Sequence, residues 1–200
     1  MNDTRLTSNF FQRDALIVAK EILGKELVRV TSQGLISGII VETEGYMGES
    51  DLASHARFGK TNRNQLMYKK GGRAYIYLIY GIYYNFNITA GRIDQPEAVL
   101  IRSLEPRQGL DLARNNLDKF GRVRSDKTFM TGPGKLCVAL DIDKSFYGED
   151  IASSRSLYVL DPGGKYEIES GSRIGIDYAG KYRDKPWRFF IKNNPFVSKK

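Results

Sequence analysis

The pattern of hydrophobic and polar positions predicts a chain in which strands outnumber helices. Short runs rich in β-branched and aromatic residues, bounded by turn residues, are typical of strands. Such runs cover residues 26–30, 35–44, 74–80, 82–89 and 98–104, and later 156–160, 166–169 and 188–192. Because several runs are close neighbours along the chain, we expect hairpins and a mainly antiparallel sheet.

Helical patterns are fewer and shorter. Residues 14–23 follow a helical pattern that starts at an acidic residue and stops at glycine. Further short helices are predicted at 64–70, at 109–115 and after Gly132-Pro133, where proline suits a first helical turn. We find no internal repeat and no linker that would divide the chain. The prediction is one α+β domain spanning residues 1–200.

The densest aromatic segment is residues 75–87, and six of the twelve tyrosines fall between Tyr68 and Tyr84. This segment lies within residues 52–93, which contain no Asp or Glu but seven basic residues: Arg57, Lys60, Arg63, Lys69, Lys70, Arg73 and Arg92. Aromatic faces beside unopposed positive charge suit contact with a phosphate backbone and stacking on bases. A buried hairpin with a solvated basic flank is the alternative that the pattern leaves open.

Charge and composition narrow the class of protein. The formal net charge is +8, which favours a polyanionic partner. One cysteine and one histidine allow neither an intrachain disulfide nor a zinc site of the usual Cys/His type, so no metal or cofactor is expected. No apolar stretch is long enough to span a membrane, and the N-terminus lacks a signal-peptide core, so we expect a cytoplasmic protein.

Candidate chemistry begins in the predicted strand over residues 35–44. Alternation places Glu42 and Glu44 on one face of the strand and Thr43 on the other. Partial burial of a carboxylate at the end of such a strand would make it a better general base. Two solvated glutamates at a strand end are the alternative interpretation. We interpret Glu42 as structural.

Two further residues lie close to Glu44 in sequence, at the entrance to the acid-free stretch. They are Tyr46 and His55, and together with Glu44 they form a candidate site. A structural histidine in a polar loop is the alternative for His55.

The tyrosine-rich segment predicts a hairpin with Tyr80-Gly81 as a two-residue turn. Tyr80 would then be exposed at the tip, where an aromatic side chain can wedge between base pairs. A strict two-residue turn would place Tyr77 and Asn87 on opposite faces, so a site that uses both requires another register or a bulge.

Motif blocks in a fixed order connect these features. They are residues 41–46, 55–57, 63–64, 75–87, 100–106, 132–137, 179–181 and 186–189. In this combination the chain resembles the alkyladenine (3-methyladenine) DNA glycosylases, over nearly its whole length. The resemblance implies a monofunctional base-excision-repair hydrolase that flips a damaged purine out of duplex DNA and cleaves its N-glycosidic bond, leaving an abasic site. The implied lesions are of the 3-methyladenine, 7-methylguanine, hypoxanthine and ethenoadenine type.

The resemblance also implies an architecture and a setting. We expect a curved antiparallel sheet with surrounding helices and a protruding hairpin that enters the DNA minor groove. The implied protein is a monomer without cofactor or metal that acts on double-stranded DNA. It would be found with the DNA in the cytoplasm, or in the nucleus of a eukaryote.

Roles carry over to matching positions of this sequence. Glu44 would activate the attacking water, and Arg102 would help to hold that water. The flipped base would lie between Tyr46, His55 and Tyr77, with Asn87 on the pocket floor rejecting normal guanine through its exocyclic amino group. Tyr80 would fill the gap in the duplex, with Ile82 beside it. The candidates for contact with the DNA backbone are Arg57, Arg63, Lys69, Lys70 and Arg73.

Two other functions use the same sequence features. A non-catalytic minor-groove DNA-binding protein would use the same charge and the same exposed aromatic. A nucleoside hydrolase acting on small molecules would leave the net charge and the exposed hairpin unexplained.

Overall fold

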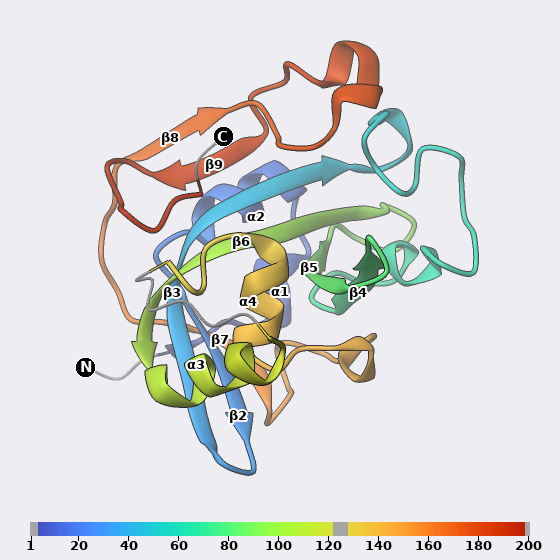
Figure 1. The fold of residues 1–200 in the computed structure, drawn as a ribbon. Coiled ribbons are helices and arrows are strands. Elements are labelled where there is room, and N and C mark those ends of the chain that lie inside the picture. The colour runs from blue at the N-terminus through green and yellow to red at the C-terminus, as the bar shows by residue number, and fades with distance from the viewer. Residues whose placement is uncertain (1–3, 122–127, 199–200) are drawn as a thin grey trace.

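A nine-stranded antiparallel sheet runs through the described part of the chain, residues 4–121 and 128–198 of a computed structural model (Figure 1). The strand order is β1-β7-β2-β3-β6-β5-β4, and a β8–β9 hairpin joins the sheet through β3. The strands are β1 (Thr4–Arg5), β2 (Glu26–Thr31), β3 (Gly34–Met47), β4 (Ala74–Ile79), β5 (Tyr83–Ala90), β6 (Glu97–Gln108), β7 (Leu157–Asp161), β8 (Ile168–Gly171) and β9 (Arg188–Ile191). The predicted α+β class with a mainly antiparallel sheet is confirmed.

Helices are short and cover both faces of the sheet. They are α1 (Ser8–Phe11), α2 (Ala15–Glu21), α3 (Leu110–Lys119) and α4 (Pro133–Ala139), with 3₁₀ turns at Gly48–Ser50, Gln65–Tyr68, Lys144–Phe146 and Asp177–Tyr182. The predicted helix over 14–23 is confirmed as α2, whose first N–H groups bond to the Asp14 carboxylate. The predicted helix at 64–70 is a 3₁₀ turn instead.

The central strands are covered from two sides (Figure 1). Helix α2 packs on β3, β5 and β6, and α4 packs on β5 and β6 from the opposite face. Apolar side chains from these elements, such as Ile22, Ile40 and Ile101, form one buried core. Polar groups of β3 and β6 are therefore far from bulk water unless a pocket reaches them.

The β4–β5 hairpin has a three-residue loop, so the predicted two-residue turn is wrong. Tyr80 and Gly81 do adopt the positive φ values of a tight hairpin turn, 51° and 68°. The third loop residue, Ile82, changes the strand register, giving the cross-strand pairs Ile79↔Tyr83, Tyr77↔Asn85 and Tyr75↔Asn87. Tyr77 and Asn87 therefore share one face, as a common site requires.

The pairing of β3 with β6 is irregular where the two carboxylates lie. Ile40 pairs with Leu104, Glu42 with Ser103, and Thr43 with Ile101. This shift leaves Arg102 without a partner in the ladder, which is the geometry of a β-bulge. Consecutive side chains of a regular strand point to opposite faces, whereas Arg102 and Ser103 both reach Glu42. The bulge is thus what turns the Arg102 side chain toward the acids.

Candidate active site

Glu44 is fully buried, and three groups hold its carboxylate. The backbone N–H of Ile174 donates to Oε1 at 2.8 Å, and Arg102 Nη1 lies 3.1 Å from the same atom. The hydroxyl of Tyr46 donates to Oε2 at 2.8 Å. A carboxylate has about four acceptor positions, so three are filled and one remains, on Oε2, among the residues that the structure describes.

Glu42 is equally buried but has no acceptor position left. Its Oε1 accepts from Arg102 Nε at 2.9 Å, Arg188 Nη1 at 3.2 Å and the Ser198 hydroxyl at 2.8 Å. Its Oε2 accepts from the Ser103 hydroxyl at 3.1 Å and the Ser198 backbone N–H at 2.8 Å. The alternative of two solvated glutamates is wrong, because both side chains have 0% exposure. Among the described residues, Glu44 therefore keeps one free acceptor position, whereas Glu42 keeps none.

Arg102 joins the two carboxylates. Its Nε contacts Glu42 and its Nη1 contacts Glu44. Burial acts to lower the pKa of its guanidinium, but the charges of Glu44 and Glu42 outweigh burial and raise that pKa. Arg102 therefore stays charged and fixes the relative position of both acids.

A buried ion pair positions the Ile174 N–H. Arg173 binds both carboxylate oxygens of Asp51 and donates to the Gly45 carbonyl at 3.0 Å. Its guanidinium also lies 4.7 Å from the centre of the Tyr46 ring. Since Arg173 precedes Ile174, these contacts hold the 172–176 segment against the end of β3. Sequence reasoning missed this segment, which has no motif of its own and lies some 130 residues from Glu44 in the chain.

A pocket of about 580 Å³ lies beside the residues that hold Glu44. The four residues predicted for the base pocket, Tyr46, His55, Tyr77 and Asn87, all line it. So does Arg102, while Glu44 lies behind the wall formed by Tyr46, Arg102 and Ile174, its three hydrogen-bonding partners. Pocket residues that sequence reasoning did not single out include Met67, Asn85, Lys135, Ile174 and Tyr178.

His55 and Tyr77 form one wall of the pocket together. Their ring centres are 4.5 Å apart in an edge-to-face arrangement. The His55 Nδ1 atom lies 2.8 Å from the Tyr75 hydroxyl. Burial, with help from the nearby charges of Arg63 and Arg57, lowers the pKa of His55 to about 4. The imidazole is therefore neutral at physiological pH.

Tyr46 packs in a separate cluster with Ala53, Ile176 and Ala179. Burial, and then the neighbouring Glu44 charge, raise the pKa of its phenol well above the usual value. Tyr46 thus stays protonated and donates to Glu44. Arg173 does not line the pocket, so it covers the ring face that points away from the pocket.

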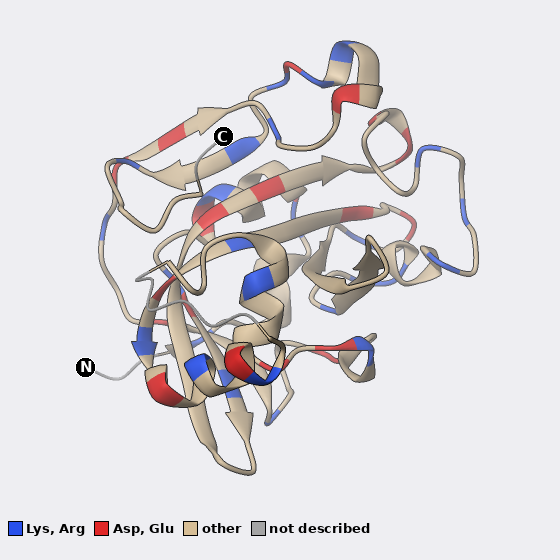
Figure 2. Ribbon diagram, viewed as in Figure 1, with Lys and Arg blue, Asp and Glu red and all other residues tan. Residues whose placement is uncertain are grey.

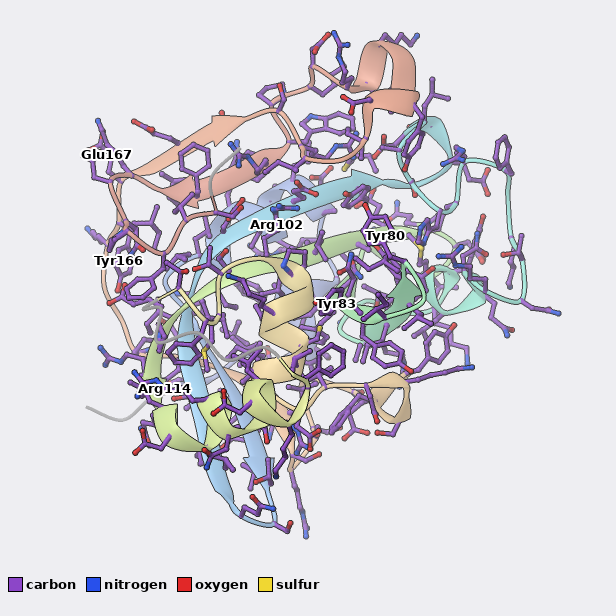
Figure 3. The ribbon with its side chains drawn as sticks, viewed as in Figure 1. Tyr80, Tyr83, Arg102, Arg114, Tyr166 and Glu167 are labelled. Atoms are coloured by element: carbon purple, nitrogen blue, oxygen red, sulfur yellow. The ribbon has the colours of Figure 1, made fainter. Side chains whose placement is uncertain are left out.

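The hairpin tip is the most exposed apolar part of the site. Tyr80 is 88% exposed, and Ile82 and Leu78 are 53% and 47% exposed. Tyr80 also lines the mouth of the pocket. Figure 3 shows Tyr80 and Tyr83 on the hairpin at one side of Arg102, with Tyr166 and Glu167 at the far side of the molecule. The expected exposure of Tyr80 at a tip is confirmed.

The predicted basic contacts are placed differently from one another. Figure 2 shows Lys and Arg spaced along the loop that follows β3, beside the hairpin. Lys69 and Lys70 are exposed. Arg63 lines the pocket, with its guanidinium 5.4 Å from the Tyr77 ring centre. Arg57 lies over the Phe58 and Tyr178 rings. Arg73 pairs with Asp150 at 3.8 Å, so part of its charge is offset.

Within residues 4–121 and 128–198, no group of three or more His, Cys, Asp or Glu side chains is arranged to hold a metal ion. No helix in the same ranges has the length and apolar character needed to cross a membrane.

The aromatic pocket, the buried Glu44–Arg102 pair and the exposed aromatic hairpin thus belong to one region of the molecule. Comparison with known proteins gives the class. Residues 9–195 match the model of the methylpurine-DNA glycosylase family, and the chain belongs to that family. It is therefore a DNA glycosylase, an enzyme of DNA repair, as the sequence resemblance predicted.

Individual relatives agree over nearly their whole length. A protein of Natranaerobius thermophilus named "Putative 3-methyladenine DNA glycosylase" is 45% identical over 197 residues, covering 97% of this chain and 98% of its own. A protein of the same name from Methanocella arvoryzae is 43% identical over 195 residues, covering 98% of this chain and 96% of its own.

Proposed function

We propose that this protein excises alkylated or deaminated purines from duplex DNA by hydrolysis of the N-glycosidic bond, with Glu44 as the general base. The observation that carries the proposal is the contrast between the two buried acids. Glu42 is saturated with donors, whereas Glu44 keeps one acceptor position on Oε2, and the three partners that hold Glu44 line the pocket. That position suits a water molecule.

The chemistry needs few groups. Glu44 takes a proton from the water as the water oxygen attacks C1′ of the sugar, and the electrons of the breaking C1′–N9 bond leave with the base. A cationic lesion departs as a neutral base, whereas a neutral lesion must also gain a proton as it leaves. Arg102, Tyr46 and the Ile174 N–H hold the Glu44 carboxylate in one orientation, so little rearrangement is required during the reaction. Alkylation that makes the purine cationic already makes it a good leaving group.

The flipped base would lie between Tyr46 and the His55–Tyr77 wall. Aromatic faces attract a cationic base by about 0.5–2 kcal/mol, which favours alkylated purines over normal adenine. Asn87 on the pocket floor would exclude normal guanine by a clash with its 2-amino group. The volume of about 580 Å³ is in the range of small-molecule sites, with room for one purine nucleotide.

The hairpin would engage the DNA. Tyr80 and Ile82, both exposed at the hairpin tip, would enter the minor groove and occupy the space left by the flipped nucleotide. Arg57, Arg63, Lys69, Lys70 and Arg73 would contact phosphates on the flanks, Arg73 the least because of Asp150. We propose that residues 1–200 act as one domain and as a monomer.

The direct test is release of a single damaged purine from a duplex oligonucleotide. Wild type is expected to release 3-methyladenine, 7-methylguanine, hypoxanthine or ethenoadenine and to leave an abasic site. Glu44→Gln keeps the side-chain shape and should lower kcat by about 10²–10⁴-fold, the usual contribution of a general base. Binding to the same duplex should change far less.

Each rival function gives a different result. A minor-groove DNA-binding protein would bind the duplex and leave every base attached. A nucleoside hydrolase would cleave free nucleosides at rates comparable with those on DNA. If Glu44→Gln were as fast as wild type, the role of Glu44 would be wrong although the enzyme class would stand.

A further inference from the structure

One buried polar group of the pocket has no use in the reaction described above. Asn85 lies on β5 opposite Tyr77, lines the pocket and is 93% buried, with 7% exposure. Its Oδ1 atom is buried and lacks a hydrogen-bond partner within the described ranges of the chain. Leaving a buried acceptor unpaired is unfavourable, so such atoms in folded proteins need an explanation.

The amide nitrogen of Asn85 has a hydrogen-bond partner, unlike the amide oxygen. Its Nδ2 donates to the Tyr77 hydroxyl at 3.4 Å, a long contact. Burial raises the pKa of the Tyr77 phenol, so this hydroxyl stays protonated. The amide is thus tied to the aromatic wall on its nitrogen side, and the carbonyl oxygen is the amide atom without a partner among the described residues.

Position along the sheet places Asn85 between two parts of the site. Asn87 pairs with Leu100 at one end of the β5–β6 ladder, so Asn85 continues the same strand face in the direction of Arg102. Asn87 Nδ2 donates to the Tyr75 carbonyl at 3.1 Å, a shorter contact than that of Asn85 Nδ2 with the Tyr77 hydroxyl. Of these two asparagines, Asn85 is the one whose amide oxygen is buried without a partner among the described residues.

We propose that Asn85 reads the base, with its Oδ1 accepting a hydrogen bond from the exocyclic amino group of an adenine-type lesion. This inference rests on the proposed function. An amide oxygen requires an N–H donor, and the amino group is the N–H donor that an adenine base carries. A 6-oxo purine such as hypoxanthine presents an acceptor at the same place and leaves Oδ1 unpaired. Asn85 therefore sets a preference for amino-bearing purines.

A charge-matched pair of lesions separates hydrogen bonding from cation attraction. Duplexes carrying 7-methyladenine or 7-methylhypoxanthine both present a cationic purine, and they differ in the 6-amino or 6-oxo group. Wild type should show the higher kcat/KM on 7-methyladenine. Asn85→Leu, which keeps a similar shape without an acceptor, should lower kcat/KM on 7-methyladenine about tenfold, equivalent to ~1.4 kcal/mol. It should change kcat/KM on 7-methylhypoxanthine less than about threefold.

Two further measurements distinguish recognition of the base by Asn85 from a purely structural effect. Asn85→Gln keeps the amide and, with room in the pocket, should retain most of the preference for the amino-bearing lesion. Because Oδ1 is unpaired in the free protein, Asn85→Leu should leave the Tm unchanged or raise it. A lowered Tm would assign Asn85 to packing and overturn the proposal.

The outcomes that contradict this inference differ from those that contradict the proposed function. An equal loss on both lesions would make Asn85 a water-positioning residue beside Arg102, and no loss on either would make it irrelevant to the base. Either result overturns the proposed hydrogen bond between Asn85 and the amino group of the base, although excision by wild type still stands. Failure of wild type to release either base would overturn the proposed function itself.

Discussion

The reaction end of the pocket and the hairpin tip are built in opposite ways. At the reaction end, Glu42, Glu44 and Arg102 are buried and hydrogen-bonded to one another and to neighbouring strands. At the tip, Tyr80 and Ile82 lie open to solvent. The groups that would do chemistry are fixed before DNA arrives, whereas the groups that would meet DNA are left without a partner.

This difference follows from what each region must bind. A carboxylate that activates water gains from a fixed orientation, and burial with paired charges provides it. An exposed aromatic side chain contributes nothing to folding, so its contacts are made only when a duplex supplies them. Substitutions at the reaction end should therefore lower stability, whereas substitutions at the hairpin tip should weaken DNA recognition.

The largest expected effect is at Arg173, on the buried side. Arg173→Met leaves Asp51 as an unpaired buried charge and releases the segment that presents the Ile174 N–H to Glu44. We expect the free energy of unfolding to fall by about 3–5 kcal/mol, as for other broken buried pairs. Denaturant unfolding followed by circular dichroism measures this change.

A matched control is available in Arg183→Met. Arg183 also pairs with an aspartate, Asp184, but both side chains are more than half exposed. Its loss should alter stability by less than about 1 kcal/mol, the usual range for surface pairs. Equal losses for Arg173 and Arg183 would contradict the view that the reaction end is held by buried pairing.

The next effect tests the hairpin tip. Tyr80→Ala should leave the Tm unchanged because the side chain is 88% exposed. It should weaken excision from lesion DNA about tenfold or more, since base stacking on one aromatic side chain is worth about 1–3 kcal/mol. Tyr166→Ala is the control, as Tyr166 is exposed on the far side of the molecule in Figure 3. Equal activity of both variants would remove Tyr80 from DNA recognition.

His55 gives a pH-dependent effect at the boundary between the two regions. Its pKa of about 4 lies below the unfolded value of 6.5. Between these values the unfolded chain binds more protons than the folded chain, so stability is complete above about pH 6.5 and falls as the pH drops toward 4. The loss is at most about 3 kcal/mol.

The measurement compares unfolding free energies of wild type and His55→Gln from pH 7 to pH 4. The variant should lose less stability over this range than wild type. A wild-type curve parallel to that of the variant would mean that His55 is not held neutral by its surroundings.

Local features of this site were predictable from sequence, because they depend on neighbours in the chain. The alternation of β3 correctly placed Glu42 and Glu44 on one side, where both contact Arg102. The Asp14 cap defined the start of α2, which ends at Glu21, two residues before the predicted end. Motif resemblance supplied Tyr46, His55, Tyr77 and Asn87, which the fold brings to one pocket.

Features that depend on distant partners were not predictable. The Ile174 N–H reaches Glu44 only because Arg173 finds Asp51, 122 residues away in sequence. One additional loop residue, Ile82, reversed the expected faces of the hairpin. The free acceptor of Asn85 follows from that register, which no local pattern specifies. Such details are set by tertiary packing and not by the propensity of any one segment.

The smallest expected effect concerns the basic flank of the hairpin. Lys70 is exposed and lies shortly before β4, so Lys70→Gln should weaken binding to any duplex by a few fold, whether or not a lesion is present. The slope of log affinity against log salt should decrease by about one. Lys192→Gln is the matched control, because Lys192 already pairs with Glu167 on the far side of the molecule. If Lys70→Gln changed lesion preference but not the salt slope, Lys70 would belong to the base pocket and not to the backbone contacts. That result would mean that the region fixed before DNA arrives includes the flank of the hairpin.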